Sequence, residues 1–198
     1  METLYQDKDI IVIIKPVGID SEKQMVDIIK EYTTTNVYPI HRLDKNVSGV
    51  MVYALNKKSA ADLSKCVQNK EMIKEYIAIV HGTTSLNGSL KDYLYKDSSK
   101  NKVYVVKKLR KNVKEASLTF ETLKYHNNRS LVKIKLETGR THQIRVQFAS
   151  RGYPIVGDHK YGSKDKQTNP MLYCYQLTFK HHDQVMTFTN YPPFSQHF

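Results

Sequence analysis

The sequence is poor in the residues that build cross-linked or membrane-spanning proteins. Only two cysteines occur among 198 residues, Cys66 and Cys174, and they lie far apart in unrelated contexts. A structural disulfide or a cysteine-based metal site is therefore not expected, and both residues are predicted to be small and buried. No apolar run approaches the roughly 18 residues of a membrane span. The N-terminus lacks a signal-peptide pattern, so a cytoplasmic protein is expected.

Acidic residues are also scarce relative to basic ones. The chain has 31 lysines and arginines against 19 aspartates and glutamates, a formal net charge of +12. A surplus this large attracts polyanions and predicts salt-sensitive association with nucleic acid. A lysine-rich proteome that keeps its proteins soluble would give the same balance. The 14 tyrosines would suit stacking on unpaired bases.

Length and composition are those of a small globular protein. Hydrophobic residues make up 40% of the chain and charged residues 25%, and the length suits one domain over residues 1–198. Alternating or continuous apolar runs predict strands at residues 10–14, 50–55, 76–80, 118–122, 132–136, 172–179 and 185–189. Many strands with a few helices, not in strict alternation, predict the α+β class.

Helices are expected where apolar residues recur on one face. The first would be capped by Ser21, in capping-box spacing with Gln24, and would bury Met25, Ile28, Ile29 and Tyr32. The second would be capped by Ser59, with Ala60, Leu63 and Val67 as its apolar stripe. A short third helix would begin near residues 138–141 and stop at Gly152. A turn is expected at Asn87-Gly88, and the lysine-rich residues 91–115 predict a solvated or RNA-facing loop.

Two segments place reactive side chains beside turns or strand starts. Residues 41–49, His-Arg-Leu-Asp-Lys-Asn-Val-Ser-Gly, put the carboxylate of Asp44 in a polar loop that leads into a buried strand. Asp44 could carry chemistry there, or it could cap a turn as most loop aspartates do. Residues 74–76, Lys-Glu-Tyr, open an apolar strand, where a tyrosine is usually part of the core.

A third segment combines two arginines with glycines. Residues 138–145 read Thr-Gly-Arg-Thr-His-Gln-Ile-Arg and precede Gly-Tyr-Pro-Ile-Val-Gly-Asp at 152–158. Backbone N–H groups at a helix start favour anions, so Arg140 could lie on a phosphate path. Arg145 could point inward, and a buried arginine needs a carboxylate partner. We expect that partner to be Asp44.

Together, and in this order, these segments resemble the signature motifs of the RluA-type pseudouridine synthases. Those motifs are an H-R-L-D-x-x-T-S-G loop, a K-E-Y strand start, and T-G-R-T-H-Q-[IL]-R followed by G-x-P-I-x-G-D. Residues 4–16 are also similar to the opening strand of the family. The resemblance therefore runs from the first residues of the chain to about residue 179. It implies the pseudouridine synthase fold, a bent, mixed but mainly antiparallel sheet with flanking helices and an RNA-binding cleft. The early start of this strand predicts the catalytic domain without an N-terminal S4 domain.

The resemblance also implies a role for each site residue. Asp44 matches the catalytic aspartate, Arg42 the arginine that fills the gap left by the flipped nucleotide, and Tyr76 the tyrosine that stacks on uracil. Arg145 matches the partner of the aspartate, which it would keep ionised and oriented. The expected activity is isomerisation of uridine to pseudouridine in ribosomal or transfer RNA, by a monomer that needs no metal or organic cofactor. Attack at C1′, attack at C6 and a glycal route stay open for Asp44.

Departures from the family pattern affect few positions. Val47 stands where the family usually has threonine, Gln147 where a histidine is common, and residues 18–22 differ from the usual run. None of these changes removes a core catalytic group, so activity is expected and RNA preference is left open.

Three alternatives compete with this function. An RNA N-glycosidase would use an aspartate at C1′ with a second carboxyl group, for which Glu137 and Asp158 are available. A non-catalytic RNA-binding or ribosome-assembly protein could keep the fold. A metal site could be built from His41, His81, His142 or the pair His181-His182. It is not expected, because these histidines lack the spacing of metal-binding motifs.

Overall fold

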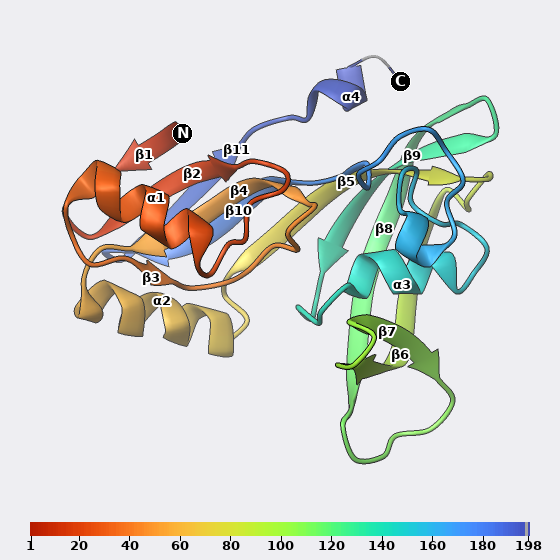
Figure 1. Ribbon diagram of the computed structural model, residues 1–198, viewed down its shortest axis with the longest axis horizontal. Coiled ribbons are helices and arrows are strands. Elements are labelled where there is room, and N and C mark those ends of the chain that lie inside the picture. Colours follow the sequence, from red (N-terminus) through yellow and green to blue (C-terminus); the bar gives the residue numbers. More distant parts are fainter. Residues whose placement is uncertain (197) are drawn as a thin grey trace. The chain divides into compact units, whose positions relative to one another are not determined.

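The computed structural model describes residues 1–196 and 198, which form two compact units (Figure 1). The first unit comprises residues 1–74 and 173–192, so it is built from both ends of the chain. The second unit comprises residues 75–172 and the C-terminal residues from Pro193 on. The predicted single domain over residues 1–198 stays a prediction.

The first unit is a mixed sheet with two helices. Its strands are β1 (Glu2–Gln6), β2 (Ile10–Lys15), β3 (Tyr38–Pro39), β4 (Ser48–Ala54), β10 (Leu172–His181) and β11 (Gln184–Thr189). The order is β1-β2-β4-β10-β11, and β3 also pairs with β4. All of these pairings are antiparallel except that of β4 with β10, which is parallel. The helices are α1 (Gln24–Thr33) and α2 (Lys57–Gln68).

Alternation along β4 distributes the core between these helices. Val50, Val52 and Ala54 pack in one cluster with Leu63 of α2. Successive strand residues point to opposite faces, so Tyr53 faces the other way, and its hydroxyl donates to the backbone oxygen of Ser21 just before α1. Each fully buried Val, Leu or Ile contributes about 1.5–3 kcal/mol. The two faces of β4 thus hold α1 and α2 on opposite sides of the sheet (Figure 1).

The second unit is an antiparallel sheet with one short packed helix. Its strands, in the order β5-β9-β8-β6-β7, are β5 (Ile73–His81), β6 (Asn87–Asp97), β7 (Lys102–Val106), β8 (Val113–His126) and β9 (Arg129–Leu136). Helix α3 (Gln143–Ala149) packs through Val146 against Leu94, Val103 and Ala116 of this sheet. A 3-10 turn (His159–Tyr161) and α4 (Pro193–Gln196) complete the unit.

The predicted α+β class is confirmed, and each predicted strand lies within or overlaps an observed one. The lysine-rich region 91–115 is mostly not a loop, because β6, β7 and the start of β8 occupy it. The expected turn at Asn87-Gly88 is likewise the first part of β6. Lysines and tyrosines alternate with buried Leu90, Leu94 and Val103 here, so a half-exposed hairpin carries the charge.

The predicted helix caps were wrong by one to three residues. Ser21 does not cap α1: its hydroxyl donates to the backbone oxygen of Leu43, and Lys23, at the N-cap position, makes no side-chain cap hydrogen bond. The Asp20 carboxylate accepts from the N–H groups of Glu22 and Lys23, just before the helix. Ile28 and Tyr32 are 37% and 62% exposed, because the buried face of α1 consists of Met25, Val26 and Ile29. Asn56, not Ser59, caps α2, where its side chain accepts from the Ser59 N–H.

The third helix is shorter than predicted. α3 begins at Gln143, after His142 in a left-handed conformation, and ends at Ala149, before Gly152 with φ +82°. Both cysteines are buried thiols, as predicted. Within the described residues, no helix combines the length and apolar character needed to cross a bilayer.

Candidate active site

The loop that carries Asp44 is held to the first unit by apolar anchors on both sides of it. Leu43 and Val47 are 4% and 2% exposed, whereas Asp44 between them is only half-buried. The N–H of Val47 donates to the backbone oxygen of Asp44 at 2.9 Å, which closes a tight turn. The sequence thus anchors two apolar side chains in the core and leaves the carboxylate accessible between them.

His41 fastens the start of this loop to β4. Its Nε2 accepts from the backbone N–H of Val52 at 3.3 Å, and the residue is 9% exposed. Burial, reinforced by the positive charge of Lys74, lowers the pKa of His41 to about 3. The imidazole is therefore neutral at physiological pH, with its proton on Nδ1, and it serves as a structural acceptor.

Gly49 ends the loop where the backbone makes a close approach. Its φ is +132°, and a Cβ atom there would lie 2.3 Å from the backbone oxygen of Cys174. Gly49 and Cys174 are register partners in the parallel pairing of β4 with β10. Only glycine meets both conditions, so this residue sets where the loop stops and the strand begins.

Lys15 contacts the Asp44 loop, which was not predicted from the sequence. Its side chain is 0% exposed, and its ammonium donates to the backbone oxygens of Pro16, Ile19 and Lys45 at 2.7, 2.9 and 3.3 Å. Burial lowers its pKa to about 8, against the opposing charges of Asp20 and Asp44. Lys15 therefore ties residues 16–19 to the Asp44 loop and places a cation in the field of that carboxylate. The sequence signal that could have indicated this buried lysine is its position at the end of an apolar strand, just before Pro16.

Arg42 points outward from the same loop. Its side chain is 51% exposed, and its Nη1 lies 3.0 Å from Oε2 of Glu22, which is 49% exposed. Exposed ion pairs of this kind contribute about 0–1 kcal/mol. The guanidinium can exchange Glu22 for a phosphate or base at little cost, which suits an arginine that moves to meet RNA.

In the second unit, Arg145 is paired with Asp158 rather than left to solvent. Its Nε and Nη2 donate to the two carboxylate oxygens at 2.7 and 2.9 Å, a two-point contact between side chains 8% and 1% exposed. The guanidinium also lies over the ring of Tyr161, 5.2 Å from its centroid. These contacts fix the plane of the guanidinium. The role of Asp158 as this partner was not predicted.

Gln143 holds the glycine-containing segment 138–142 that precedes Arg145. Its Oε1 accepts from the hydroxyl of Thr138 at 2.8 Å and from the N–H of Arg140 at 3.0 Å, and its Nε2 donates to the backbone oxygen of Ser117. The Arg140 side chain is exposed, and its Nε donates to the backbone oxygen of Glu115 at 2.9 Å. One buried amide therefore keeps the segment folded back on the sheet while its arginine faces solvent.

Tyr76 lies near the start of β5, opposite Ile134 of β9, and is 5% exposed. Arg42 and Asp44 share one loop of the first unit, and Tyr76, Arg140 and Arg145 belong to the second. The expected pairing of Asp44 with Arg145 stays a prediction.

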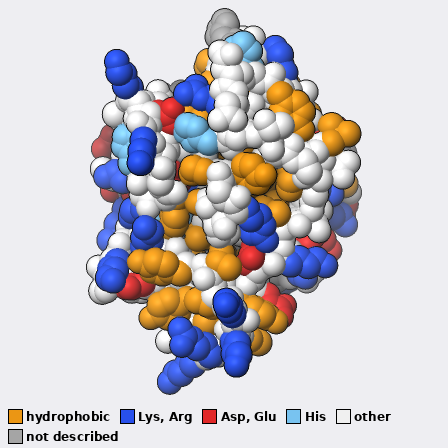
Figure 2. Space-filling model, turned by 90° about the vertical axis from the view of Figure 1, so that its right-hand side faces the viewer, with side chains coloured by type: hydrophobic (Ala, Val, Ile, Leu, Met, Phe, Trp, Pro, Cys, Tyr) orange, Lys and Arg blue, Asp and Glu red, His pale blue; other side chains and the backbone are white. Residues whose placement is uncertain are grey.

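Exposed cations gather at the β6–β7 end of the second unit. The segment between β7 and β8 and the first residues of β8 carry five of them, all exposed: Lys107, Lys108, Arg110, Lys111 and Lys114. Arg110 lies over the ring of Tyr95 at 5.7 Å, and Lys102 over that of Tyr104 at 5.8 Å. Figure 2 shows Lys and Arg side chains (blue) clustered with hydrophobic ones (orange) at the lower end of the view. Cations interleaved with aromatic rings suit single-stranded nucleic acid.

Residues 9–150 match the RNA pseudouridylate synthase family. The tRNA pseudouridine synthase C of Haemophilus ducreyi is 30% identical over 211 residues, which cover 96% of this chain and 86% of that protein. The ribosomal large subunit pseudouridine synthase D of Buchnera aphidicola is 32% identical over 189 residues, covering 85% of this chain and 60% of that protein. The chain spans about 60% of the length of several such relatives.

The fold is similar to that of solved relatives. Human RNA pseudouridylate synthase domain containing 1 superposes with a TM-score of 0.86 at 23% identity, covering 98% of this chain and 84% of that one. This likeness confirms the predicted pseudouridine synthase fold. With a family match over more than half of its residues and a relative at 30% identity over almost its full length, the chain belongs to the RNA pseudouridylate synthase family.

Proposed function

We propose that this protein isomerises uridine to pseudouridine in ribosomal or transfer RNA, with Asp44 as the catalytic carboxylate. The observation that carries the proposal is the family match over residues 9–150, which includes the Asp44 loop. The geometry of that loop supports it: a half-buried carboxylate lies between two buried anchors, within the field of a buried lysine. Such a carboxylate is preorganised and accessible on one side.

The reaction needs no net gain or loss of atoms. The N1–C1′ bond of uridine breaks, the uracil turns, and C5 bonds to C1′, while C5 loses a proton and N1 gains one. The base must first leave its stack, at a cost of a few kcal/mol. Arg42 is proposed to fill the gap, which its exposed position and weak ion pair allow. Tyr76 is proposed to stack on the base, and its low exposure suits a contact shielded from water.

Arg145 is proposed to orient Asp44 during the reaction. Its two-point contact with Asp158 and its position over Tyr161 leave the guanidinium little freedom. A cation fixed in this way stabilises a negative charge without reorganising. Arg140 and the cations between β7 and β8 are proposed to bind phosphates along the RNA.

The pairing of Asp158 with Arg145 also bears on the N-glycosidase alternative. A glycosidase would need a second carboxyl group near the sugar. Asp158 is 1% exposed and committed to a guanidinium, and Glu137 is exposed to solvent. Because Asp158 is bound to Arg145, it is not free to donate a proton to a leaving group, which favours isomerisation over hydrolysis.

Asp44→Asn is the direct test. RNA labelled with tritium at C5 of uridine releases tritium to water when pseudouridine forms, and we expect the variant to release none above background. RNA affinity should stay within a few-fold of wild type. The matched control is Asp27→Asn, the same change at an exposed site on α1, which should retain full activity. Wild-type turnover by Asp44→Asn would refute the assignment.

The wild-type reaction distinguishes the remaining alternatives. Release of free uracil, detected by chromatography, would indicate a glycosidase. RNA binding without tritium release on any cellular RNA fraction would indicate a binding protein that has kept the fold. Mapping of pseudouridines in ribosomal and transfer RNA, with and without the gene, identifies the substrate.

A further inference from the structure

Four side chains of the types that ligate metals, from the two ends of the chain, lie together in the first unit. Asp7 and Asp9 lie in and beside the turn between β1 and β2, and His181 and His182 lie at the turn between β10 and β11. One ligand atom from each residue lies within 4.8 Å of the others. From this cluster we propose that Asp7, Asp9, His181 and His182 bind a divalent transition-metal ion, with Zn²⁺ the best match. The proposal does not depend on the proposed function.

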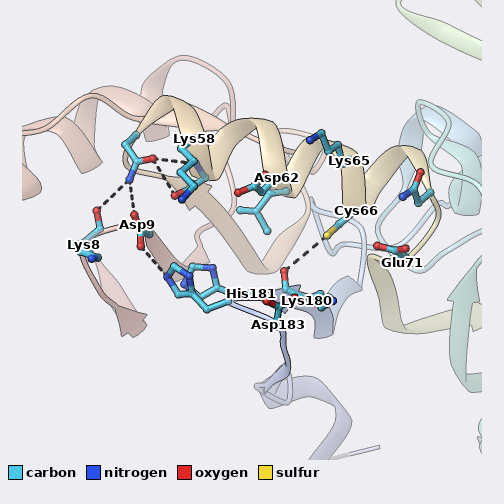
Figure 3. A pocket seen from close by; sticks show the side chains of 15 residues that line it. Lys8, Asp9, Lys58, Asp62, Lys65, Cys66, Glu71, Lys180, His181 and Asp183 are labelled. Atoms are coloured by element: carbon cyan, nitrogen blue, oxygen red, sulfur yellow. Dashed lines mark hydrogen bonds and ion pairs between the residues drawn. The ribbon is translucent and has the colours of Figure 1, made fainter.

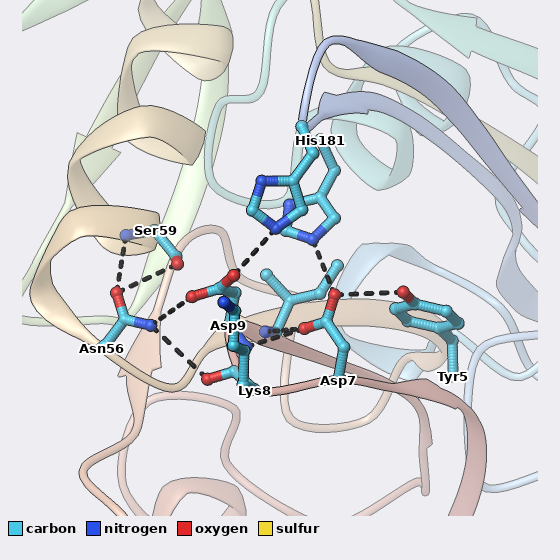
Figure 4. Close-up of polar contacts among 9 residues, drawn as sticks. Tyr5, Asp7, Lys8, Asp9, Asn56, Ser59 and His181 are labelled. Carbon is cyan, nitrogen blue, oxygen red and sulfur yellow. Dashed lines mark hydrogen bonds and ion pairs between the residues drawn. The ribbon is translucent and has the colours of Figure 1, made fainter.

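The two carboxylates are already oriented by other groups. Oδ1 of Asp7 accepts from the backbone N–H groups of Asp9 and Ile10 at 2.7 and 2.8 Å, and Oδ1 of Asp9 accepts from Nδ2 of Asn56 at 2.7 Å. The second oxygen of each carboxylate faces a histidine, as the dashed lines in Figure 4 show. Metal-binding carboxylates are held in this way by outer hydrogen bonds.

Both imidazoles present Nε2 to these carboxylates. Nε2 of His181 lies 2.9 Å from Oδ2 of Asp7, and Nε2 of His182 lies 2.8 Å from Oδ2 of Asp9. Consecutive strand residues normally point to opposite faces, yet these two rings are 4.0 Å apart between centroids. His182 adopts a left-handed conformation, φ 48°, in the two-residue turn, and this conformation turns its ring toward His181. The turn therefore converts a sequence pair into a spatial one.

The charge and donor set fit Zn²⁺ better than the common alternatives. Two imidazole nitrogens and two carboxylate oxygens balance the charge of a divalent ion, and the proton of each neutral imidazole moves from Nε2 to Nδ1. Mg²⁺ and Ca²⁺ prefer all-oxygen sites, whereas Zn²⁺ takes nitrogen and oxygen donors tetrahedrally. Donor atoms at about 2.0–2.1 Å from zinc are roughly 3.3 Å apart, so small rotations of the side chains close the site.

The cluster is accessible to an ion from solvent, and a bound ion there would connect separate elements of the first unit. Asp9 and His182 border an open groove of about 780 Å³ along α2, shown in Figure 3, and the His182 side chain is 63% exposed. His181 is only 9% exposed. Asn56 links Asp9 to the N-terminus of α2, where it is the cap. A bound ion would thus join the β1–β2 turn, the β10–β11 turn and α2.

The sequence predicted no metal site, although it singled out the His181-His182 pair. The carboxylates that complete the cluster lie more than 170 residues away along the chain. Only the shared sheet, in which β4 pairs with β2 on one side and with β10 on the other, brings them together.

Zinc titration of the metal-free protein tests the proposal. Isothermal calorimetry should show one site per chain, and zinc at 100-fold above its dissociation constant should raise Tm by roughly 5–10 °C. Mg²⁺ should leave Tm unchanged. Absence of a zinc-dependent Tm shift and of a one-to-one isotherm would overturn the proposal and leave the cluster as two histidine–aspartate hydrogen bonds.

His182→Asn separates the loss of a metal ligand from any loss of stability in the metal-free protein. Asparagine tolerates the left-handed turn, so the metal-free Tm should match that of wild type. Zinc affinity should fall by at least the roughly 10- to 100-fold seen when outer partners of a metal ligand are removed. The matched control, His126→Ala, removes an exposed histidine of the second unit and should bind zinc like wild type. Equal zinc affinity in His182→Asn and wild type would contradict the assignment, whatever the fate of pseudouridine synthase activity.

Discussion

The neutral, buried His41 should make the protein lose stability in mild acid. Its pKa falls from 6.5 in the unfolded chain to about 3 in the folded protein. Between these values the unfolded state binds a proton that the folded state does not, so stability falls as pH drops from 6.5 toward 3. Each pH unit in this window costs about 1.4 kcal/mol.

The magnitude can be isolated between pH 6.5 and 4.5 by comparing wild type with a variant that lacks the imidazole. Because the unfolded-state imidazole is half protonated at pH 6.5, these two pH units correspond to roughly 2.3 kcal/mol, a large share of the roughly 5–15 kcal/mol that stabilises a domain. His41→Leu removes the titrating group and leaves the Val52 N–H without its acceptor, at a cost of about 1–3 kcal/mol that does not depend on pH. We therefore expect wild type to be more stable near pH 7 and the two proteins to converge near pH 4.5.

Urea unfolding at a series of pH values measures this directly. The chain has no tryptophan, so circular dichroism or the fluorescence of its 14 tyrosines reports unfolding. The difference in unfolding free energy between wild type and His41→Leu should shrink by roughly 2.3 kcal/mol from pH 6.5 to 4.5. His41→Gln keeps an acceptor for the Val52 N–H. Like His41→Leu, it should lack the fall in unfolding free energy that protonation of His41 causes in wild type. Parallel pH profiles for wild type and both variants would refute a neutral buried His41.

Three further predictions concern Arg145, Lys15 and the exposed lysines of residues 107–114. Arg145→Met should lower stability by about 3–5 kcal/mol because Asp158 stays buried and charged, whereas Arg145→Met with Asp158→Leu should recover stability in urea unfolding without recovering tritium release. Lys15→Met should loosen the Asp44 loop and lower kcat more than RNA affinity; an unchanged kcat would contradict its positioning role. Alanine at the four lysines between residues 107 and 114 should weaken RNA binding and reduce its salt slope, measured by filter binding, by up to about 0.7 for each phosphate that the variant no longer neutralises. Four lysines of α2 and its flanks, replaced likewise, provide the matched control, and equal weakening in both would argue against a specific basic surface.

The fold class, the strands and the family could be predicted from the sequence because they depend on local pattern. The alternation of Val132, Ile134 and Leu136 with polar residues is a strand signal on one short segment. The motifs around Asp44 and Arg145 likewise occupy continuous stretches. A short window therefore contains the information needed for each of these predictions.

What could not be predicted depends on contacts between distant residues. Ser21 does not cap α1 because its hydroxyl donates to Leu43, 22 residues away, and Asp20 binds the N–H groups just before the helix. Asp158 and Lys15 gained their roles from partners whose position follows only from the folded chain. The hairpin within residues 91–115 was mistaken for a loop because its lysines fill the exposed positions of the strands, and their charge masked the buried alternation.

The same contacts hold the buried side chains of the candidate site, whereas the arginines proposed to bind RNA stay exposed. His41, Lys15 and Gln143 are all 9% exposed or less. Lys15 and Gln143 bond to backbone groups of the motif segments, at Lys45 and Arg140, and His41 joins its own segment to the backbone of β4. Arg42 and Arg140, which are proposed to meet RNA, are exposed and held only by single contacts at the surface. Ordering the backbone in advance lowers the entropy cost of positioning Asp44, while loosely held arginines can exchange their partners for phosphates. Under the proposed function, the buried polar groups that hold these segments therefore contribute to catalysis by positioning Asp44.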